Sequence, residues 1–144
     1  MPTSTPIIVR PALTSDGPTL FLLALAFATS FAAERPAFDL ALAELLAQPD
    51  AYLAVAEENG AVIGYVLGFA HWTFFANGRV AWVEEITVAE THQRRGGGRR
   101  LMTAFEAWAV SREAKLVALA TRRASEFYRA LGYVESAAYL RKRL

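Results

Sequence analysis

Three consecutive glycines flanked by arginines form a candidate anion-binding segment in this 144-residue chain, with the sequence Gln93-Arg94-Arg95-Gly96-Gly97-Gly98-Arg99-Arg100. Glycine has no Cβ, so its backbone N–H groups can approach a ligand closely. If a helix begins at these glycines, its first N–H groups and the positive end of its dipole also favour a phosphate. We therefore interpret the segment as a site for a diphosphate ligand; a flexible loop and an Arg/Gly patch that binds RNA are the alternatives.

Two adjacent carboxylates, Glu84 and Glu85, are candidates for moving a proton just before this segment. In a regular strand, neighbouring side chains point to opposite faces, so only one of the two can face a given cleft. Glu84 shares its alternation with the apolar residues Trp82 and Ile86, which places a carboxylate on an otherwise apolar face. We therefore prefer Glu84 as a general base, with Glu85 as the alternative.

The composition limits the other chemistry that this chain can perform. Fifteen Lys and Arg residues against fourteen Asp and Glu residues give a net charge of +1. This charge provides no global field for nucleic acid or an anionic membrane, and we expect neither partner. The absence of cysteine excludes disulfides, thiolate metal sites and a cysteine nucleophile, and the scattered histidines His71 and His92 argue against a zinc site. We expect no metal.

The first part of the chain contains two predicted helices behind a short strand at residues 7–10. Ser15 or Asp16 can cap a helix that has Pro18 in its first turn and runs to about Ser30. Pro36 opens the second helix, which ends before residue 49 and carries one apolar stripe made by Phe38, Leu42, Leu45 and Leu46. The apolar run at residues 20–28 is too short to span a bilayer. We interpret it as a buried helix of a cytoplasmic protein rather than a secretory signal.

The rest of the chain predicts a β-meander followed by alternating helices and strands. Asn59-Gly60 separates two apolar runs and Asn77-Gly78 precedes a third, and Asn-Gly is a strong hairpin signal because both residues tolerate φ > 0. From Gly98 to about Arg112 the apolar period is helical. Strands are then expected at residues 115–121 and 139–144, with a short helix at 124–131 closed by Gly132 as a left-handed cap. The predicted order is β-α-α-β-β-β-α-β-α-β, a single mixed α/β domain over residues 1–144.

Four segments of this chain together resemble the GNAT superfamily of N-acetyltransferases, which use acetyl-CoA. They are Ile8-Val9-Arg10-Pro11-Ala12, the strand at residues 83–88, the loop at residues 93–98, and Phe127-Tyr128-Arg129-Ala130-Leu131-Gly132-Tyr133. The resemblance covers essentially the whole chain and implies a central, mostly antiparallel sheet of six or seven strands flanked by four helices. Three positions depart from the usual pattern: Glu90 replaces a common proline, Gly97 a common aliphatic residue, and Thr121 a common asparagine.

The resemblance implies transfer of an acetyl group from acetyl-CoA to a primary amine of a small molecule or peptide, by direct attack in a ternary complex. It places Tyr128 beside the thioester sulfur, as a donor to the leaving thiolate. It also implies that the strand splays from its neighbour and leaves N–H groups free for the thioester carbonyl. The kink that is usual in this strand would exchange the directions of Glu84 and Glu85. The cofactor-binding residues that it implies are Ile86, Thr87, Val88, Gln93, Arg94, Arg95, Gly96, Gly97, Gly98, Arg99 and Thr121.

The acceptor side is less defined by the sequence. Several side chains near the second turn of the meander could line an acceptor pocket, although we expect most of them in the core: His71, Trp72, Phe74, Phe75 and Trp82. An aromatic wall with one carboxylate would suit a cationic amine. His71 is an alternative base, and His92 is expected to face solvent or phosphate. A sensor that binds CoA without transfer is an alternative function, and the oligomeric state stays open, although members of the family often form dimers.

Overall fold

One mixed sheet of five strands organises the part of the chain that the computed structural model describes, residues 5–28 and 30–144. The strands are β1 (Ile8–Pro11), β2 (Ala51–Glu58), β3 (Ala61–Thr73), β4 (Gly78–Val88) and β5 (Ala114–Leu119), and they lie in this order. The pairings from β1 to β4 are antiparallel, whereas β5 is parallel to β4. Four helices accompany the sheet: α1 (Gly17–Phe27), α2 (Arg35–Ala47), α3 (Gly97–Ser111) and α4 (Ser125–Ala130).

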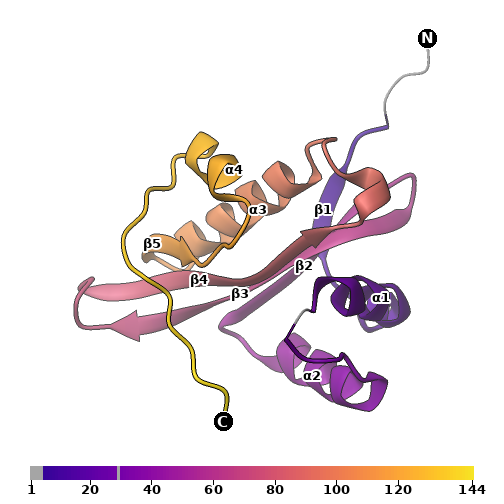
Figure 1. Cartoon of the computed structure of the whole chain (residues 1–144), viewed down its shortest axis with the longest axis horizontal. Coiled ribbons are helices and arrows are strands. Elements are labelled where there is room, and N and C mark those ends of the chain that lie inside the picture. Colours follow the sequence, from indigo (N-terminus) through magenta and orange to yellow (C-terminus); the bar gives the residue numbers. More distant parts are fainter. Residues whose placement is uncertain (1–4, 29) are drawn as a thin grey trace.

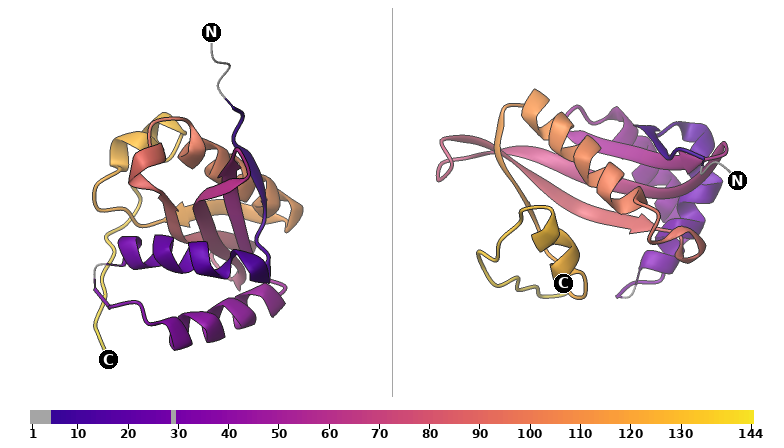
Figure 2. Two further views of the ribbon diagram at one scale, coloured as in Figure 1. Left: turned by 90° about the vertical axis from the view of Figure 1, so that its right-hand side faces the viewer. Right: turned by 90° about the horizontal axis from the view of Figure 1, so that it is seen from above.

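The helices cover the sheet from both sides, with α1 and α2 on one face and α3 on the other (Figures 1 and 2). Neighbouring residues of a strand point to opposite faces, and the two apolar clusters of the protein follow this rule. Val55 and Tyr65 pack with Leu20 of α1, while Ala54 and Val66 belong to the cluster that contains Phe105 of α3. The central strands are therefore apolar on both faces, which explains their nearly continuous apolar sequence.

The predicted meander is confirmed, and its two Asn-Gly turns have the expected backbone. Asn59 and Gly60 both have positive φ, at 54° and 76°, and connect β2 to β3. Asn77 has a φ of 57° at the end of the turn, directly before β4. The left-handed Gly132 after α4, with a φ of 96°, also agrees with the prediction.

The start of α1 differs in detail from the predicted cap. Asp16 precedes the helix, but its carboxylate accepts hydrogen bonds from the Leu13 N–H at 2.7 Å and from the Arg10 guanidinium at 2.9 and 3.0 Å. The Arg10 Nε donates to Glu57 on β2 at 2.9 Å. Asp16 therefore ties the start of α1 to the first two strands. No helix among the described residues has both the length and the apolar character that a membrane crossing requires.

The predicted strand at residues 139–144 is wrong, and with it the expectation of six or seven strands. This part of the chain, all of it described, runs from α4 past β4 towards α1 and α2 without joining the sheet (Figures 1 and 2). A strand requires a backbone neighbour, but side chains hold this segment instead. Tyr139 stacks on Trp82 at 6.5 Å, Arg141 donates to the Ser30 hydroxyl at 2.7 Å, and the Arg143 guanidinium lies 4.2 Å from the centre of the Phe31 ring.

Candidate active site

Strands β4 and β5 separate part-way along β4. Their pairing ends at Val83 and Leu119, whereas β4 continues to Val88. On its other side, β4 stays paired with β3 through Val88. In the described part of the chain, no strand pairs with the β5 side of residues 84–88, so the N–H groups that point there can bind a ligand. This geometry agrees with the splayed strand that the resemblance implied for Ile86, Thr87 and Val88.

A β-bulge in β4 determines the directions of the two candidate carboxylates. Leu67 pairs with Glu85 and Gly68 pairs with Val83, which leaves Glu84 as the extra residue of the bulge. The regular alternation that grouped Glu84 with Trp82 and Ile86 is therefore interrupted. The kink that the resemblance implied is present. Glu84 is exposed, whereas Glu85 is half-buried on the face covered by α1 and α2.

Glu85 is held by a buried tyrosine that the sequence analysis did not identify. The Tyr65 hydroxyl donates to Glu85 Oε1 at 2.7 Å, and only 3% of Tyr65 is exposed. Burial, and then the nearby carboxylate, raise the pKa of Tyr65 far above its usual range. The phenol therefore stays protonated and remains a donor to Glu85. A single hydroxyl within the apolar run of β3 was the signal for this pair in the sequence.

Glu85 also lines a hollow of about 330 Å³ beside α1 and α2. The other walls come from α1, from the residues between the two helices, and from the start of α2. Apart from Glu85 and Glu34, the lining side chains among the described residues are all alanine or phenylalanine: Ala24, Ala28, Phe31, Ala32, Ala33, Ala37 and Phe38. We call this space the acceptor hollow. It is open to solvent and joins a half-buried carboxylate to apolar walls, which is an arrangement that can hold a cation with an apolar body.

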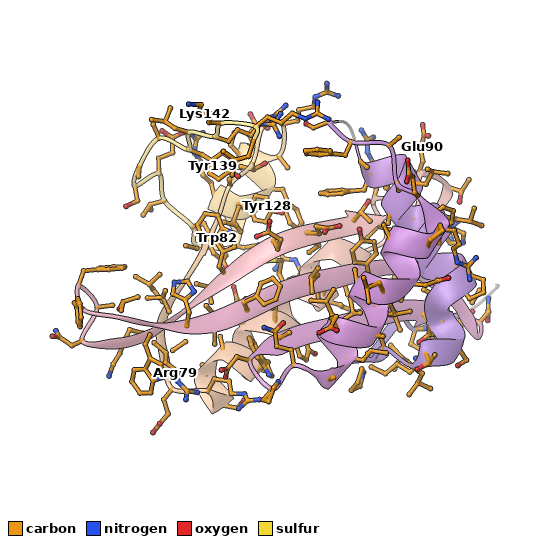
Figure 3. All side chains as sticks on the ribbon, turned by 90° about the horizontal axis from the view of Figure 1, so that it is seen from below. Arg79, Trp82, Glu90, Tyr128, Tyr139 and Lys142 are labelled. Carbon is orange, nitrogen blue, oxygen red and sulfur yellow. The ribbon has the colours of Figure 1, made fainter. Side chains whose placement is uncertain are left out.

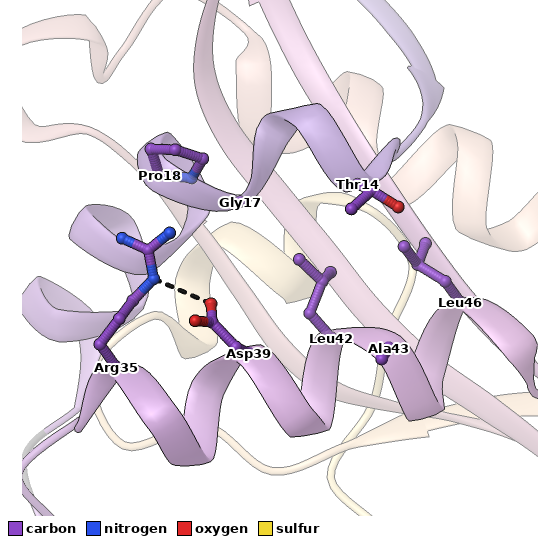
Figure 4. A pocket seen from close by; sticks show the side chains of 8 residues that line it. All are labelled: Thr14, Gly17, Pro18, Arg35, Asp39, Leu42, Ala43 and Leu46. Carbon is purple, nitrogen blue, oxygen red and sulfur yellow. Dashed lines mark hydrogen bonds and ion pairs between the residues drawn. The ribbon is translucent and has the colours of Figure 1, made fainter.

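A second hollow, of about 220 Å³, lies between the start of α1 and α2 (Figure 4). It is lined by Thr14, Gly17, Pro18, Arg35, Asp39, Leu42, Ala43 and Leu46. Arg35 and Asp39 form an ion pair across one turn of α2 at 2.8 Å. None of the lining residues belongs to β4 or β5 or was predicted as a site residue, so we do not assign this hollow to the chemistry.

Tyr128 lies on α4 and is buried, with 8% of the residue exposed. Its ring packs edge to face against Phe127 at 5.0 Å and Tyr133 at 5.9 Å. Burial raises the pKa of the Tyr128 phenol, which therefore stays protonated through neutral pH. The Tyr133 hydroxyl donates a hydrogen bond to Glu106 at 2.6 Å, whereas none of the described residues forms a hydrogen bond with the Tyr128 hydroxyl. Tyr128 is thus the phenol of this pair that can donate to a ligand.

The glycine segment begins α3, as the sequence predicted. Arg94 and Gly96 have φ values of 65° and 88°, and Gly96 is the N-cap of the helix. The Arg100 N–H donates to the Gly96 carbonyl at 3.0 Å as the first bond of α3. The N–H groups of Gly97, Gly98 and Arg99 come before that bond and have no acceptor within the helix. A helix start of this kind can bind an anion.

Two side chains of the loop are bonded to the neighbouring strands, and two others form no ion pair among the described residues. Gln93 donates its amide to the Val88 carbonyl at 3.1 Å, and Arg95 pairs with Glu58 at 2.8 Å. Arg94 and Arg99 are exposed and form no ion pair with any described residue. Gln93 and Arg95 therefore fix the loop, while Arg94 and Arg99 leave positive charge available beside the helix start.

Packing leaves little room for a side chain at the last of the three glycines. A Cβ at Gly98 would lie 3.3 Å from the Phe127 ring, whereas one at Gly97 would be in ordinary contact, 3.4 Å from a methyl group of Val88. The departure at Gly97 is therefore not explained by close packing. The Thr121 hydroxyl accepts a hydrogen bond from the Ala124 N–H at 3.1 Å and so caps the turn before α4.

The aromatic residues that were candidates for an acceptor pocket lie elsewhere. Trp72, Phe74 and Phe75 are at the end of the β3–β4 hairpin, which projects from the sheet, and they are exposed by 72%, 102% and 76% (Figure 1). The expectation that most of this group is in the core is therefore wrong. None of the group lines the acceptor hollow, and Trp82 instead stacks on Tyr139 (Figure 3).

The histidines contribute no metal site in the structure. His71 is exposed on β3, and the His92 ring lies 2.8 Å from the Thr91 hydroxyl at the entrance to the loop. Within residues 5–28 and 30–144, no three His, Asp or Glu side chains come together in a way that could hold a metal ion.

Comparisons with known proteins agree with this geometry. The profile of the acetyltransferase (GNAT) family matches residues 20–133. A search of curated proteins finds no match. Among solved structures, an aminoglycoside N-acetyltransferase in complex with CoA has a TM-score of 0.87 at 17% identity, with 100% of this chain and 98% of that chain covered.

Two further structures have the same fold. Glucosamine-6-phosphate N-acetyltransferase from Arabidopsis thaliana has a TM-score of 0.85 at 17% identity, covering 96% of this chain and 98% of its own. A transcriptional regulator from Bacillus halodurans C-125 has a TM-score of 0.86 at 20% identity, covering 96% of this chain and 99% of its own. At these identities the likeness establishes the fold alone.

Proposed function

Because this chain belongs to the acetyltransferase (GNAT) family, in which acetyl-CoA is the acetyl donor, we propose that it acetylates a primary amine by direct attack in a ternary complex. One observation carries the proposal. The half-buried Glu85, the unpaired edge of β4 and the anion-binding start of α3 follow one another within residues 85–98. A single continuous segment thus offers a carboxylate for the acceptor, N–H groups for a carbonyl and donors for a diphosphate.

The residues at the start of α3 fit the diphosphate of CoA. The N–H groups of Gly97, Gly98 and Arg99 provide donors, and the exposed guanidinium groups of Arg94 and Arg99 provide positive charge. Gln93, Arg95 and Gly96 shape the loop that presents these groups. We assign the free backbone edge of Ile86, Thr87 and Val88 to the pantetheine arm and the thioester carbonyl. Thr121 caps the turn before α4.

We assign Glu85 as the group that accepts a proton from the acceptor amine. A carboxylate near pKa 4 and an amine near pKa 10 differ by about six units, or about 8 kcal/mol. Direct abstraction from the ammonium is therefore too costly to occur in one step. Glu85 instead acts through water, or the amine arrives neutral and Glu85 takes the proton that its nitrogen loses after attack.

Tyr128 is the donor that we assign to the leaving group. In the transfer, the C–N bond forms as the C–S bond breaks, and the nitrogen releases one proton while the sulfur takes up one. Ordinary values near 10 for a tyrosine and 8.5 for a thiol make full proton transfer to the thiolate uphill by about 2 kcal/mol. Burial of Tyr128 raises its pKa and increases this cost. The phenol therefore stabilises the thiolate by a hydrogen bond, and the proton comes from solvent.

The test is release of free thiol from acetyl-CoA in the presence of a panel of primary amines. We expect release that depends on the amine, and a fall in kcat of about 10-fold to 100-fold in Tyr128→Phe. Calorimetry that shows tight CoA binding without any acceptor-dependent release would favour the alternative, a sensor that binds CoA. A Tyr128→Phe variant with the full rate at every pH would remove the tyrosine from the mechanism.

A further inference from the structure

The lining of the acceptor hollow restricts the class of amine that it can take. From its charge, size and apolar walls we infer that the acceptor is a small primary amine with an uncharged, apolar stem, an alkylamine or arylalkylamine. This inference rests on the proposed function, because it names the substrate class for the same site. Three properties of the hollow carry it.

The first property is charge. The two ionisable residues in the lining, Glu85 and Glu34, are both acidic. Arg141 contacts Ser30 and Arg143 lies over the Phe31 ring, but neither arginine lines the hollow itself. An ammonium group is attracted by both carboxylates, whereas an acceptor that also carries a carboxylate meets two like charges. The hollow therefore discriminates against amino acids.

The second property is polarity. Among the described residues, the remaining seven in the lining are five alanines and two phenylalanines, and none of their side chains has a hydrogen-bonding group. Where the acceptor lies against these walls, a hydroxyl on it would lose a bond to water without replacement, because none of these side chains can act as a partner. An apolar stem loses no such bonds and gains contact with the phenylalanine rings. The walls therefore discriminate against amino sugars.

The third property is size. The volume of about 330 Å³ is near the lower end of the range of about 300–1,000 Å³ that is usual for ligand pockets. Small side chains keep the space open, since Ala24 and Ala28 are one turn apart on α1 and its end, and Ala37 faces them from α2. A larger side chain at one of these positions would occupy the space of the stem.

Matched pairs of amines test the class directly in the thiol-release assay. Phenethylamine and phenylalanine differ by one carboxylate, and so do propylamine and 4-aminobutyrate. Cyclohexylamine and glucosamine compare an apolar ring with a hydroxylated one. We expect kcat/KM at least 10-fold higher for the uncharged apolar member of each pair. Equal values, or a preference for the carboxylated or hydroxylated member, would overturn the inference.

Substitution of two alanines on α2, one in the lining of each hollow, distinguishes the acceptor hollow from the second hollow. Ala37→Leu fills part of the acceptor hollow and should raise the KM for phenethylamine at least 10-fold while the KM for acetyl-CoA stays unchanged. Ala43→Leu makes the same change in the second hollow and should leave both constants unchanged (Figure 4). If Ala37→Leu does not fold, Ala32→Leu replaces it. A folded variant with unchanged acceptor KM would show that the amine binds elsewhere.

The acidic charge of the hollow can be tested at Glu34, without altering the proposed base Glu85. Glu34→Gln should narrow the preference for phenethylamine over phenylalanine about threefold, and Glu44→Gln, on the same helix but outside the lining, should not. No thiol release with any amine, while calorimetry still detects CoA binding, would refute the proposed function. Amine-dependent release with the opposite preference would refute only the substrate class.

Discussion

The two sides of the candidate site are built in different ways. The cofactor side consists mainly of backbone groups from one continuous stretch, residues 86–99, where a strand edge meets a helix start. The acceptor side consists of side chains from residues 24–38 and from Glu85, which the fold brings together. The first depends on the absence of Cβ atoms, and the second depends on which side chains are present.

This difference predicts separate responses to substitution. On the cofactor side, a new side chain should matter only if its atoms block the approach of the ligand to the backbone N–H groups. On the acceptor side, a new side chain changes the wall of the hollow directly. Substitutions on the two sides should therefore affect the kinetic constants of different substrates. A variant on one side that changed the kinetic constants of both substrates would contradict this separation.

Glu85 lies where the two sides meet, and its substitution should have the largest effect. In Glu85→Gln, the Tyr65 hydroxyl can still donate to the side-chain oxygen, so the fold should persist while the proton acceptor is lost. We expect kcat to fall about 10²-fold to 10⁴-fold, the range for removal of a general base. The measurement is thiol release at saturating acetyl-CoA and amine.

Glu84→Gln is the control for this experiment, because it makes the same change one residue earlier in the bulge. Its loss of kcat should be much smaller, since the carboxylate is exposed and does not line the acceptor hollow. A severe loss in Glu84→Gln with little change in Glu85→Gln would return the role of base to Glu84.

The next largest effect is expected on the cofactor side, from Gly98→Leu. The new Cβ would lie 3.3 Å from the Phe127 ring, and the rest of the side chain would cover the N–H groups at the start of α3. We expect CoA binding to weaken about 10-fold or more, which corresponds to about 1.4 kcal/mol, as measured by calorimetry. The KM of the amine should not change.

Gly60→Ala is the matched control for Gly98→Leu. Gly60 has a φ of 76°, and a Cβ there would meet no atom within 4 Å, so the change strains a distant turn without blocking a ligand. It should reduce stability by about 1 kcal/mol and leave CoA binding unchanged. Wild-type affinity in Gly98→Leu would mean that the diphosphate does not use this helix start.

The sequence predicts the turns and the start of α3 well because their signals are local. The turns at Asn59 and Asn77 require positive φ, and both have it. The glycines before the amphipathic α3 also lie at a strand-to-helix junction that a single segment defines. Each of these features depends on residues that are neighbours in the sequence, so backbone preferences alone are sufficient to identify it.

The direction of Glu85 and the path of the last segment depend on contacts between distant segments, which periodicity does not describe. The bulge at Glu84 lies in the pairing of β4 with β3, whereas periodicity assumes a regular strand, and only the resemblance implied the kink. The alternation of residues 139–144 is typical of a strand, but whether a strand forms depends on a free partner, and here side-chain contacts with Trp82, Ser30 and Phe31 take its place. Trp72 is aromatic yet exposed, because it lies on a projecting hairpin rather than under a helix.

The smallest effect is expected from the ion pair that anchors α1, the helix that forms one wall of the acceptor hollow. The hydrogen bond from Arg10 lowers the pKa of Asp16, so this group stabilises the fold above its ordinary pKa near 4, and the stabilisation is lost as the pH falls through the folded value. Asp16→Asn should lower the free energy of unfolding at pH 7 by about 1 kcal/mol and flatten its decline below about pH 4.

Urea unfolding at pH 7, 4 and 3 measures this effect, with Asp39→Asn as the control. Asp39 forms an exposed pair with Arg35 one turn away on α2, and such pairs contribute about 0.3–0.5 kcal/mol. Because Asp16 ties α1 to the strands, its loss should also raise the KM of the amine slightly while the KM of acetyl-CoA stays constant. If the KM of acetyl-CoA rises instead, α1 supports the cofactor side as well, and the two sides are not independent.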